Sequence, residues 1–147
     1  MPKKTMPTPD IIIGVDVIKF KSFFASFRDR IPPTGTTVTM TPIYIDPKLA
    51  DVYSGTRLSI KGKPVVIEFR FRGVYKPVGI DFTKQAGDDP NDPSGAKDFP
   101  KRQFDVQSCF ITNKFKDAHA VYKFQFSISD GHGNIGVTDP IITHDTP

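Results

Sequence analysis

The chain has one cysteine, Cys109, and no tryptophan among its 147 residues. A single thiol cannot form an intramolecular disulfide or a thiolate metal cluster, which excludes the small folds that disulfides hold together. Because Cys109 lies in a strand-like run, we expect it to be a buried and inert thiol. The aromatic part of any core must come mainly from the thirteen phenylalanines.

Long apolar runs are also absent. No segment approaches the roughly 20 apolar residues that a membrane-spanning helix requires. The N-terminal MPKKTMPTPD has two lysines, but only three isoleucines follow before Gly14 and Asp16 interrupt the run. That run is too short for a secretory leader, so we expect a cytoplasmic protein without a membrane contact, unless a leader has been removed.

The sequence has no long cluster of basic or of acidic residues. The 20 basic and 16 acidic residues are interspersed and give a net charge of +4. This pattern favours a solvated mixed surface over a dedicated nucleic-acid arm. The length predicts one domain over residues 11–142, preceded by a flexible arm at 1–10 and followed by a loose tail at 143–147.

What the chain does contain is strand periodicity. Residues 64–72 and 121–129 alternate apolar and polar side chains, as in strands with one buried face. Further strand patterns occur at 11–20, 36–45, 57–60, 78–82, 104–111 and 135–138, and Pro42 predicts an edge position or a bulge. The expected inward-facing structural residues are Tyr122, Phe124, Phe126, Phe69 and Phe71.

Helical signals are few. Residues 46–55 predict one or two helical turns, with Asp46 as the cap, Pro47 at the first position and Gly55 at the end. Phenylalanines spaced through 20–31 fit one side of a short helix, but they fit a strand as well. Because no long helix is available to connect parallel strands, antiparallel pairing is expected. The predicted fold is an all-β, two-sheet sandwich of seven to eight antiparallel strands.

The closing segment resembles bacterial immunoglobulin-like modules. Ala120-Val121-Tyr122-Lys123-Phe124 is similar to the start of their penultimate strand, and residues 129–134 are similar to the glycine-rich hairpin before their last strand. The resemblance implies an immunoglobulin-like sandwich in which the hydroxyl of Tyr122 caps a corner. Phe124 stands where antibody-type domains have a cysteine. Residues 138–142 also resemble the uncharacterised bacterial DP-EP family, named for Asp-Pro and Glu-Pro motifs, although no Glu-Pro occurs here. Neither resemblance implies an activity.

Catalytic signals are weak. His119, His132 and His144 lie near the C-terminal hairpin, but no nucleophile motif accompanies them. We therefore expect a non-enzymatic protein without a cofactor. In the polar segment 84–102, carboxylates form a candidate calcium site, since calcium prefers oxygen ligands, although such residues are also common in solvated loops. The candidate ligands are Asp88, Asp89, Asp92 and Asp98.

Two functional hypotheses remain. The first is a structural or protein-interaction module that self-associates through a sheet edge or the apolar N-terminal strand, as a homodimer, or that binds another protein. The alternative is a carbohydrate- or calcium-binding module that uses loop 84–102 and the hairpin at 130–134. Nucleic-acid binding is not expected, because Phe69 and Phe71 alternate to the face opposite Arg70 and Arg72.

Overall fold

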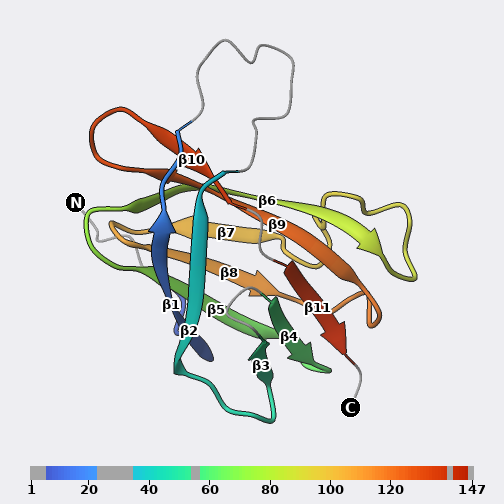
Figure 1. Ribbon diagram of the computed structural model, residues 1–147. Coiled ribbons are helices and arrows are strands. Elements are labelled where there is room, and N and C mark those ends of the chain that lie inside the picture. Colours follow the sequence, from blue (N-terminus) through green and yellow to red (C-terminus); the bar gives the residue numbers. More distant parts are fainter. Residues whose placement is uncertain (1–5, 23–34, 54–56, 139–140, 146–147) are drawn as a thin grey trace, which may run out of the picture.

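The computed structural model describes residues 6–22, 35–53, 57–138 and 141–145, which form an all-β fold of two stacked sheets (Figure 1). The described residues contain eleven strands and no helix. The first sheet has the order β2 (Thr37–Tyr44), β1 (Ile11–Lys19), β5 (Val65–Phe71), β8 (Ser108–Asn113) and β7 (Lys101–Phe104). No helix of the described part could cross a membrane.

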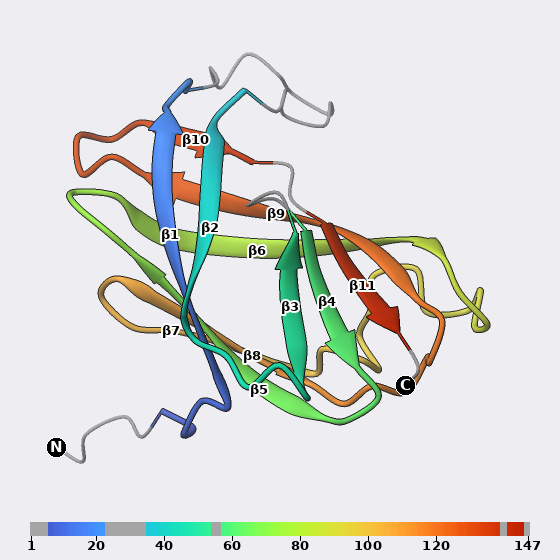
Figure 2. The ribbon, with the colours of Figure 1, turned by 60° about the horizontal axis from the view of Figure 1, so that its bottom comes forward.

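The second sheet is built around β9 (Val121–Ser129). On one side β9 pairs with β6 (Lys76–Ala86). On the other side it pairs with β10 (Ile135–Val137) at one end and with β11 (Ile141–Asp145) at the other. The sheet then continues through β4 (Arg57–Lys61) to β3 (Ala50–Tyr53), and Figure 2 shows β3, β4 and β11 side by side.

Aromatic rings of β5 and β9 meet between the sheets, as the alternation of both segments predicts. The ring of Phe126 lies edge-on to the rings of Phe69 and Phe71, with centroids 5.1 and 5.0 Å apart. Such edge-to-face pairs add about 0.5–1.5 kcal/mol each beyond the burial of their area. The expectation that these rings form a shared interior is confirmed: Tyr122, Phe124, Phe126, Phe69 and Phe71 are all buried.

The expectation of purely antiparallel pairing is wrong. Strand β1 pairs in parallel with β5, and β4 pairs in parallel with β11. A parallel pair needs a long crossover, which we expected only from a helix. Here strands provide it: the chain leaves β1, passes through β2, then through β3 and β4 of the opposite sheet, and returns at β5. The described residues contain eleven strands rather than the expected seven or eight, because β3, β7 and β11 were not among the predicted segments.

The helical turns expected at 46–55 are not formed in the described part of that segment. The carboxylate of Asp46 accepts the amide of Lys48 at 2.9 Å, and the amide of Leu49 donates to the carbonyl of Asp46 at 2.8 Å. This makes a single turn, after which β3 pairs with β4 and buries Ala50 completely. Strand pairing thus overrides the local helix signal. Gly55 and residues 23–34, which include most of the phenylalanine stripe, lie outside the described residues.

The hairpin of β1 and β2 reaches across to the second sheet at β10. The amides of Gly35 and Thr36 donate to the carbonyl of Val137 at 3.2 and 3.3 Å, and Ser22 forms a bridge with Gly136. A Cβ at Gly136 would lie 2.1 Å from the hydroxyl oxygen of Thr36, so only glycine permits this approach. The two sheets are therefore joined by backbone hydrogen bonds at this end of the molecule.

Backbone pairing reaches beyond residue 142 at one expected domain boundary and to Asp10 at the other. Strand β11 continues to Asp145, so the predicted end at residue 142 lies inside a strand that pairs with β4. At the other end, the amide of Asp10 donates to the carbonyl of Val66 and the carboxylate of Asp10 accepts the amide of Val66, both at 2.8 Å. Asp10, the last residue of the expected arm, is thus bound to the first sheet.

Candidate interaction site

The polar loop predicted at 84–102 is shorter than expected and is anchored to the core. Strand β6 continues to Ala86 and β7 begins at Lys101, which leaves 87–100 as the loop. Near its end, the ring of Phe99 is buried and stacks on Phe82, with centroids 3.9 Å apart and planes 7° from parallel. This contact fixes the end of the loop against the inner face of β6.

Asp117 holds the start of the loop. One carboxylate oxygen accepts the ammonium of Lys84 at 2.8 Å and the amide of Asp89 at 3.0 Å, and the other accepts the amide of Asp88 at 3.0 Å. Only 6% of the Lys84 side chain and 2% of the Asp117 side chain are exposed. Burial alone would raise the pKa of Asp117, but the hydrogen bonds from Lys84 and the loop amides hold it below its usual value.

Asp98 holds the other end of the loop. Its Oδ1 accepts the amides of Lys116 and Asp117 at 2.6 and 3.0 Å, and its Oδ2 accepts the hydroxyl of Tyr122. The resemblance implied that this hydroxyl caps a corner, and in the structure it joins β9 to the loop. Burial and the adjacent Asp98 carboxylate raise the pKa of Tyr122, so the phenol remains a proton donor.

The four aspartates proposed as calcium ligands do not converge. The carboxylate of Asp92 accepts the amide of Lys97, that of Asp89 pairs with the ammonium of Lys97 at 3.0 Å, and that of Asp88 pairs with His119 at 2.6 Å. The carboxylate of Asp98 accepts hydrogen bonds from the amides of Lys116 and Asp117 and from the hydroxyl of Tyr122. Among the described residues, no group of three or more His, Cys, Asp or Glu is placed to hold a metal ion. The loop carboxylates bind a backbone amide, a lysine and a histidine instead.

The other reactive side chains also have structural roles. Cys109 is fully buried, which confirms the expectation of a buried thiol, and burial raises the pKa of this thiol to about 12. His119 is exposed, and the neighbouring Asp88 carboxylate raises its pKa. In the hairpin, Asp130 accepts the amides of His132 and Asn134 at 2.7 and 3.2 Å, so turn formation accounts for this cluster.

One residue expected in water is buried. Glu68 lies on the outer face of β5 but is only 5% exposed. Its Oε2 accepts the Nε of Arg70 at 2.7 Å and the hydroxyl of Ser108 at 2.8 Å. The charged partner of Glu68 is therefore Arg70 on the same strand, and its partner on β8 is the uncharged Ser108, so the outer face of the first sheet is less solvated at Glu68 than the alternation suggested.

Strand β2 is a free sheet edge, as Pro42 predicted. In the described residues it pairs only with β1, with a register shift at Ile12/Ile13. The carbonyl of Val15 accepts a hydrogen bond from the amide of Arg72, so the backbone groups of Val15 point toward β5 and away from β2. Met40 lies opposite Val15 on β2, and in such an antiparallel pair the backbone groups of Met40 point away from β1. By alternation, the outward backbone groups of β2 belong to Val38, Met40 and Pro42.

The composition of β2 is unusual for an edge. Its sequence TVTMTPIY has no charged residue, and Ile43 and Tyr44 are 43% and 60% exposed. Natural sheets commonly protect an edge with lysines or other charges, because free backbone groups template pairing with another chain. The absence of charge over 36–45 was visible in the sequence, but its meaning depended on knowing that this strand has a free edge.

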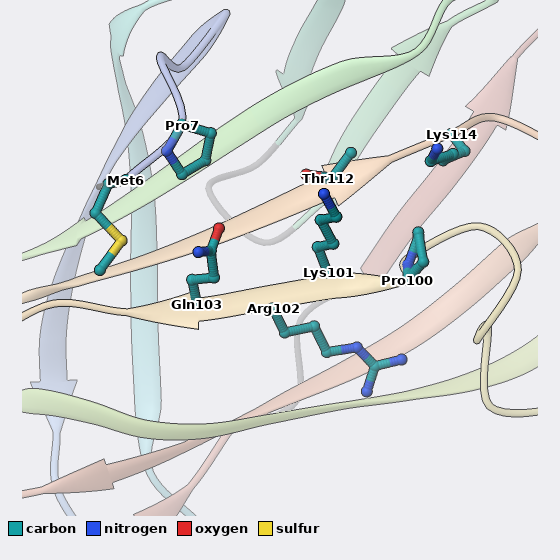
Figure 3. Close-up of a pocket in the computed structure, with 8 residues that line it drawn as sticks. All are labelled: Met6, Pro7, Pro100, Lys101, Arg102, Gln103, Thr112 and Lys114. Atoms are coloured by element: carbon teal, nitrogen blue, oxygen red, sulfur yellow. The ribbon is translucent and has the colours of Figure 1, made fainter. Parts of the chain in front are cut away.

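Strand β7 forms another edge, and a groove of about 580 Å³ lies beside it (Figure 3). In Figure 3, Lys101 and Gln103 extend to the side of β7 on which Met6 and Pro7 of the N-terminal arm lie, whereas Arg102 points to the opposite face. Thr112 of β8, Pro100 and Lys114 complete the lining. The sequence analysis did not identify this groove, because residues 6–10 were expected to be flexible.

No protein-family model matches this chain, and no curated protein matches it either. The description of its function therefore depends on the geometry above.

Proposed function

We propose that this chain is a non-enzymatic, immunoglobulin-like interaction module that self-associates by pairing the β2 edges of two copies. The observation that carries the proposal is the long, uncharged, free edge of β2 with its exposed Ile43 and Tyr44. An edge of this kind gains backbone hydrogen bonds and buries apolar side chains when a second strand is added.

Strand order supports the immunoglobulin-like part of the proposal. From β5 onward, β5, β8 and β7 share one sheet, while β6, β9 and the pair β10 and β11 share the other. This is the order of strands B, E and D facing C, F and G in an immunoglobulin domain. The chain differs in that β1 lies parallel to β5, where strand A of such a domain would be. The Asp-Pro motif at 139–140 lies outside the described residues.

The N-terminal strand, the other surface proposed for self-association, is less suitable than β2. In the first sheet β1 is paired on both sides, with β2 and with β5. Its backbone groups are therefore used within the chain. The alternative function, a carbohydrate- or calcium-binding loop, has weaker support, because the loop carboxylates of Asp89, Asp92 and Asp98 are directed to internal partners.

Sedimentation equilibrium tests the proposal from about 1 to 500 μM, a range in which a weak dimer dissociates. We expect the native chain to dimerise, and we expect the double substitution Thr41→Lys and Ile43→Lys to weaken the dimer at least tenfold, about 1.4 kcal/mol. The matched control is Val78→Lys, because Val78 is an exposed apolar residue on a different edge strand, β6. A chain that stays monomeric throughout, or an equal effect of the control, would contradict the proposal.

Hydrogen exchange gives a residue-level readout of the same interface. The amides of Val38 and Met40 point away from β1, and within the described part of the chain no strand lies on that side, so intermolecular pairing would protect them by new strand hydrogen bonds. Their protection should rise with protein concentration, while that of Thr39 and Thr41, which face β1, should not change.

A further inference from the structure

We infer that the groove beside β7 is a second interaction surface, which binds an acidic, extended segment of another protein by strand addition to the β7 edge. This inference does not depend on self-association through β2, because β2 and β7 form opposite edges of the first sheet.

The first argument is the free backbone of β7. The amide of Asp105 donates to the carbonyl of Ser108 at 2.9 Å, so Asp105 faces β8. By alternation the backbone N–H and C=O groups of Gln103 and Lys101 also point toward β8. The backbone groups of Arg102 and Phe104 point away from β8, toward the free edge. An extended peptide can use these outward groups as one more strand of the sheet.

The second argument is the charge of the groove. Lys101 and Lys114 are exposed, and neither has an ion-pair partner among the residues that the structure describes. The lining contains no carboxylate. The acidic residue of the described arm, Asp10, has its carboxylate on the amide of Val66. The groove is thus positively charged, and an acidic segment would be complementary to it.

Arg102 contributes rigidity rather than a mobile charge. Its guanidinium donates to the carbonyls of Phe99 and Ser94 at 3.2 and 3.1 Å and lies 4.7 Å from the centroid of Phe82. These contacts hold the middle of β7 in place. A fixed edge lowers the entropy that a binding segment loses on docking.

The same charges argue against two other occupants. A second β7 edge would place Lys101 and Lys114 near their copies, and like charges that face each other destabilise an interface. The first five residues of this chain carry two lysines and no acidic residue, so they also have the wrong sign. In a strand added to β7, every second side chain would face the side of the sheet on which Lys101 lies, so acidic residues at alternate positions suit this edge.

The experiment is an NMR titration of the full chain with a blocked peptide of about eight residues that alternates Glu and Val, long enough to span an edge strand. We expect the largest amide shifts at Arg102 and Phe104, and at least fivefold weaker binding in the double variant Lys101→Ala and Lys114→Ala. The matched control is Lys63→Ala with Lys76→Ala, which removes two exposed lysines outside the groove. Circular dichroism verifies that both variants are folded.

Two further probes distinguish the mode of binding. A Glu-Pro alternating peptide has the same charge but lacks half of its amide donors, so it should bind at least fivefold more weakly. Heparin tests for a general polyanion surface. Amide shifts elsewhere, equal losses in the control variant, equal binding of the Glu-Pro peptide, or stronger binding of heparin at the same lysines would each overturn the inference.

Discussion

At the scale of single residues, Asp117 has the most demanding environment in the chain. It is buried, it is charged, and it accepts a lysine and several loop amides. A buried charge is tolerated only when it is paired and hydrogen-bonded, and removing one partner leaves the other uncompensated. We expect Asp117→Asn to lower the free energy of unfolding by roughly 3–5 kcal/mol. Urea denaturation measures the change, with the exposed Asp88→Asn as the control.

The lowered pKa of Asp117 also predicts a pH dependence. Above about pH 4, the usual carboxyl pKa, both the folded and the unfolded chain are ionised at this site and the stabilisation is complete. As the pH falls below that value, the unfolded chain takes up a proton more readily than the folded chain, so stability is lost. Denaturation curves between about pH 5 and 2 should show a steeper decline for the native chain than for Asp117→Asn. Parallel declines would mean that other carboxylates dominate.

Tyr122 joins the core to the loop through its hydroxyl. In Tyr122→Phe the ring packing is kept, but the Oδ2 of Asp98 loses the donated hydrogen bond inside a buried site. An unsatisfied buried acceptor costs about 1–3 kcal/mol, and that is the destabilisation we expect by urea denaturation. Tyr44→Phe, at an exposed position, should change stability by less than about 0.5 kcal/mol.

At the scale of elements, a truncation within β11 tests whether the folded domain ends at residue 142 or extends to Asp145. Deleting residues 143–147 removes three residue pairs with β4, at Thr143, His144 and Asp145. At about 1 kcal/mol for each lost hydrogen bond, we expect a loss of roughly 2–4 kcal/mol. The control deletion of residues 146 and 147 leaves β11 intact. If both deletions had the same small effect on the urea midpoint, residues 143–145 would be the loose tail that the sequence suggested.

The elements also show what the sequence could and could not predict. Alternation located β5 and β9 and the direction of Phe69 and Phe126, because side-chain period is a local property. Pro42 indicated an edge for a similarly local reason: it lacks an amide donor. The parallel partner of β1 and the role of Asp117 depend on segments far apart in the chain. No local pattern distinguishes Asp117 from the other aspartates, so the carboxylates of loop 84–102 were interpreted as calcium ligands.

At the scale of the whole molecule, the arrangement of strands predicts a single unfolding transition. The hairpin of β1 and β2 could have been an independent addition to the strands that follow. Instead, Ile11, Ile13 and Val15 are fully buried in the common core, and the amides of Gly35 and Thr36 bond to Val137 in the opposite sheet. The hairpin therefore has no core of its own and cannot detach without exposing the interior between the sheets.

We accordingly expect three probes of urea unfolding to give the same midpoint, as two-state unfolding requires. The probes are far-ultraviolet circular dichroism, tyrosine fluorescence and hydrogen exchange of β1 amides. Exchange of the Gly14 and Asp16 amides, which face β2, should require the same free energy as exchange of the β9 amides. Weakening the link between sheets with Gly136→Ala, where the new Cβ would clash with Thr36, should shift all three curves together. An earlier transition confined to β1 and β2 would show that the hairpin is a separate folding unit, and that the β2 edge can be released without unfolding the rest.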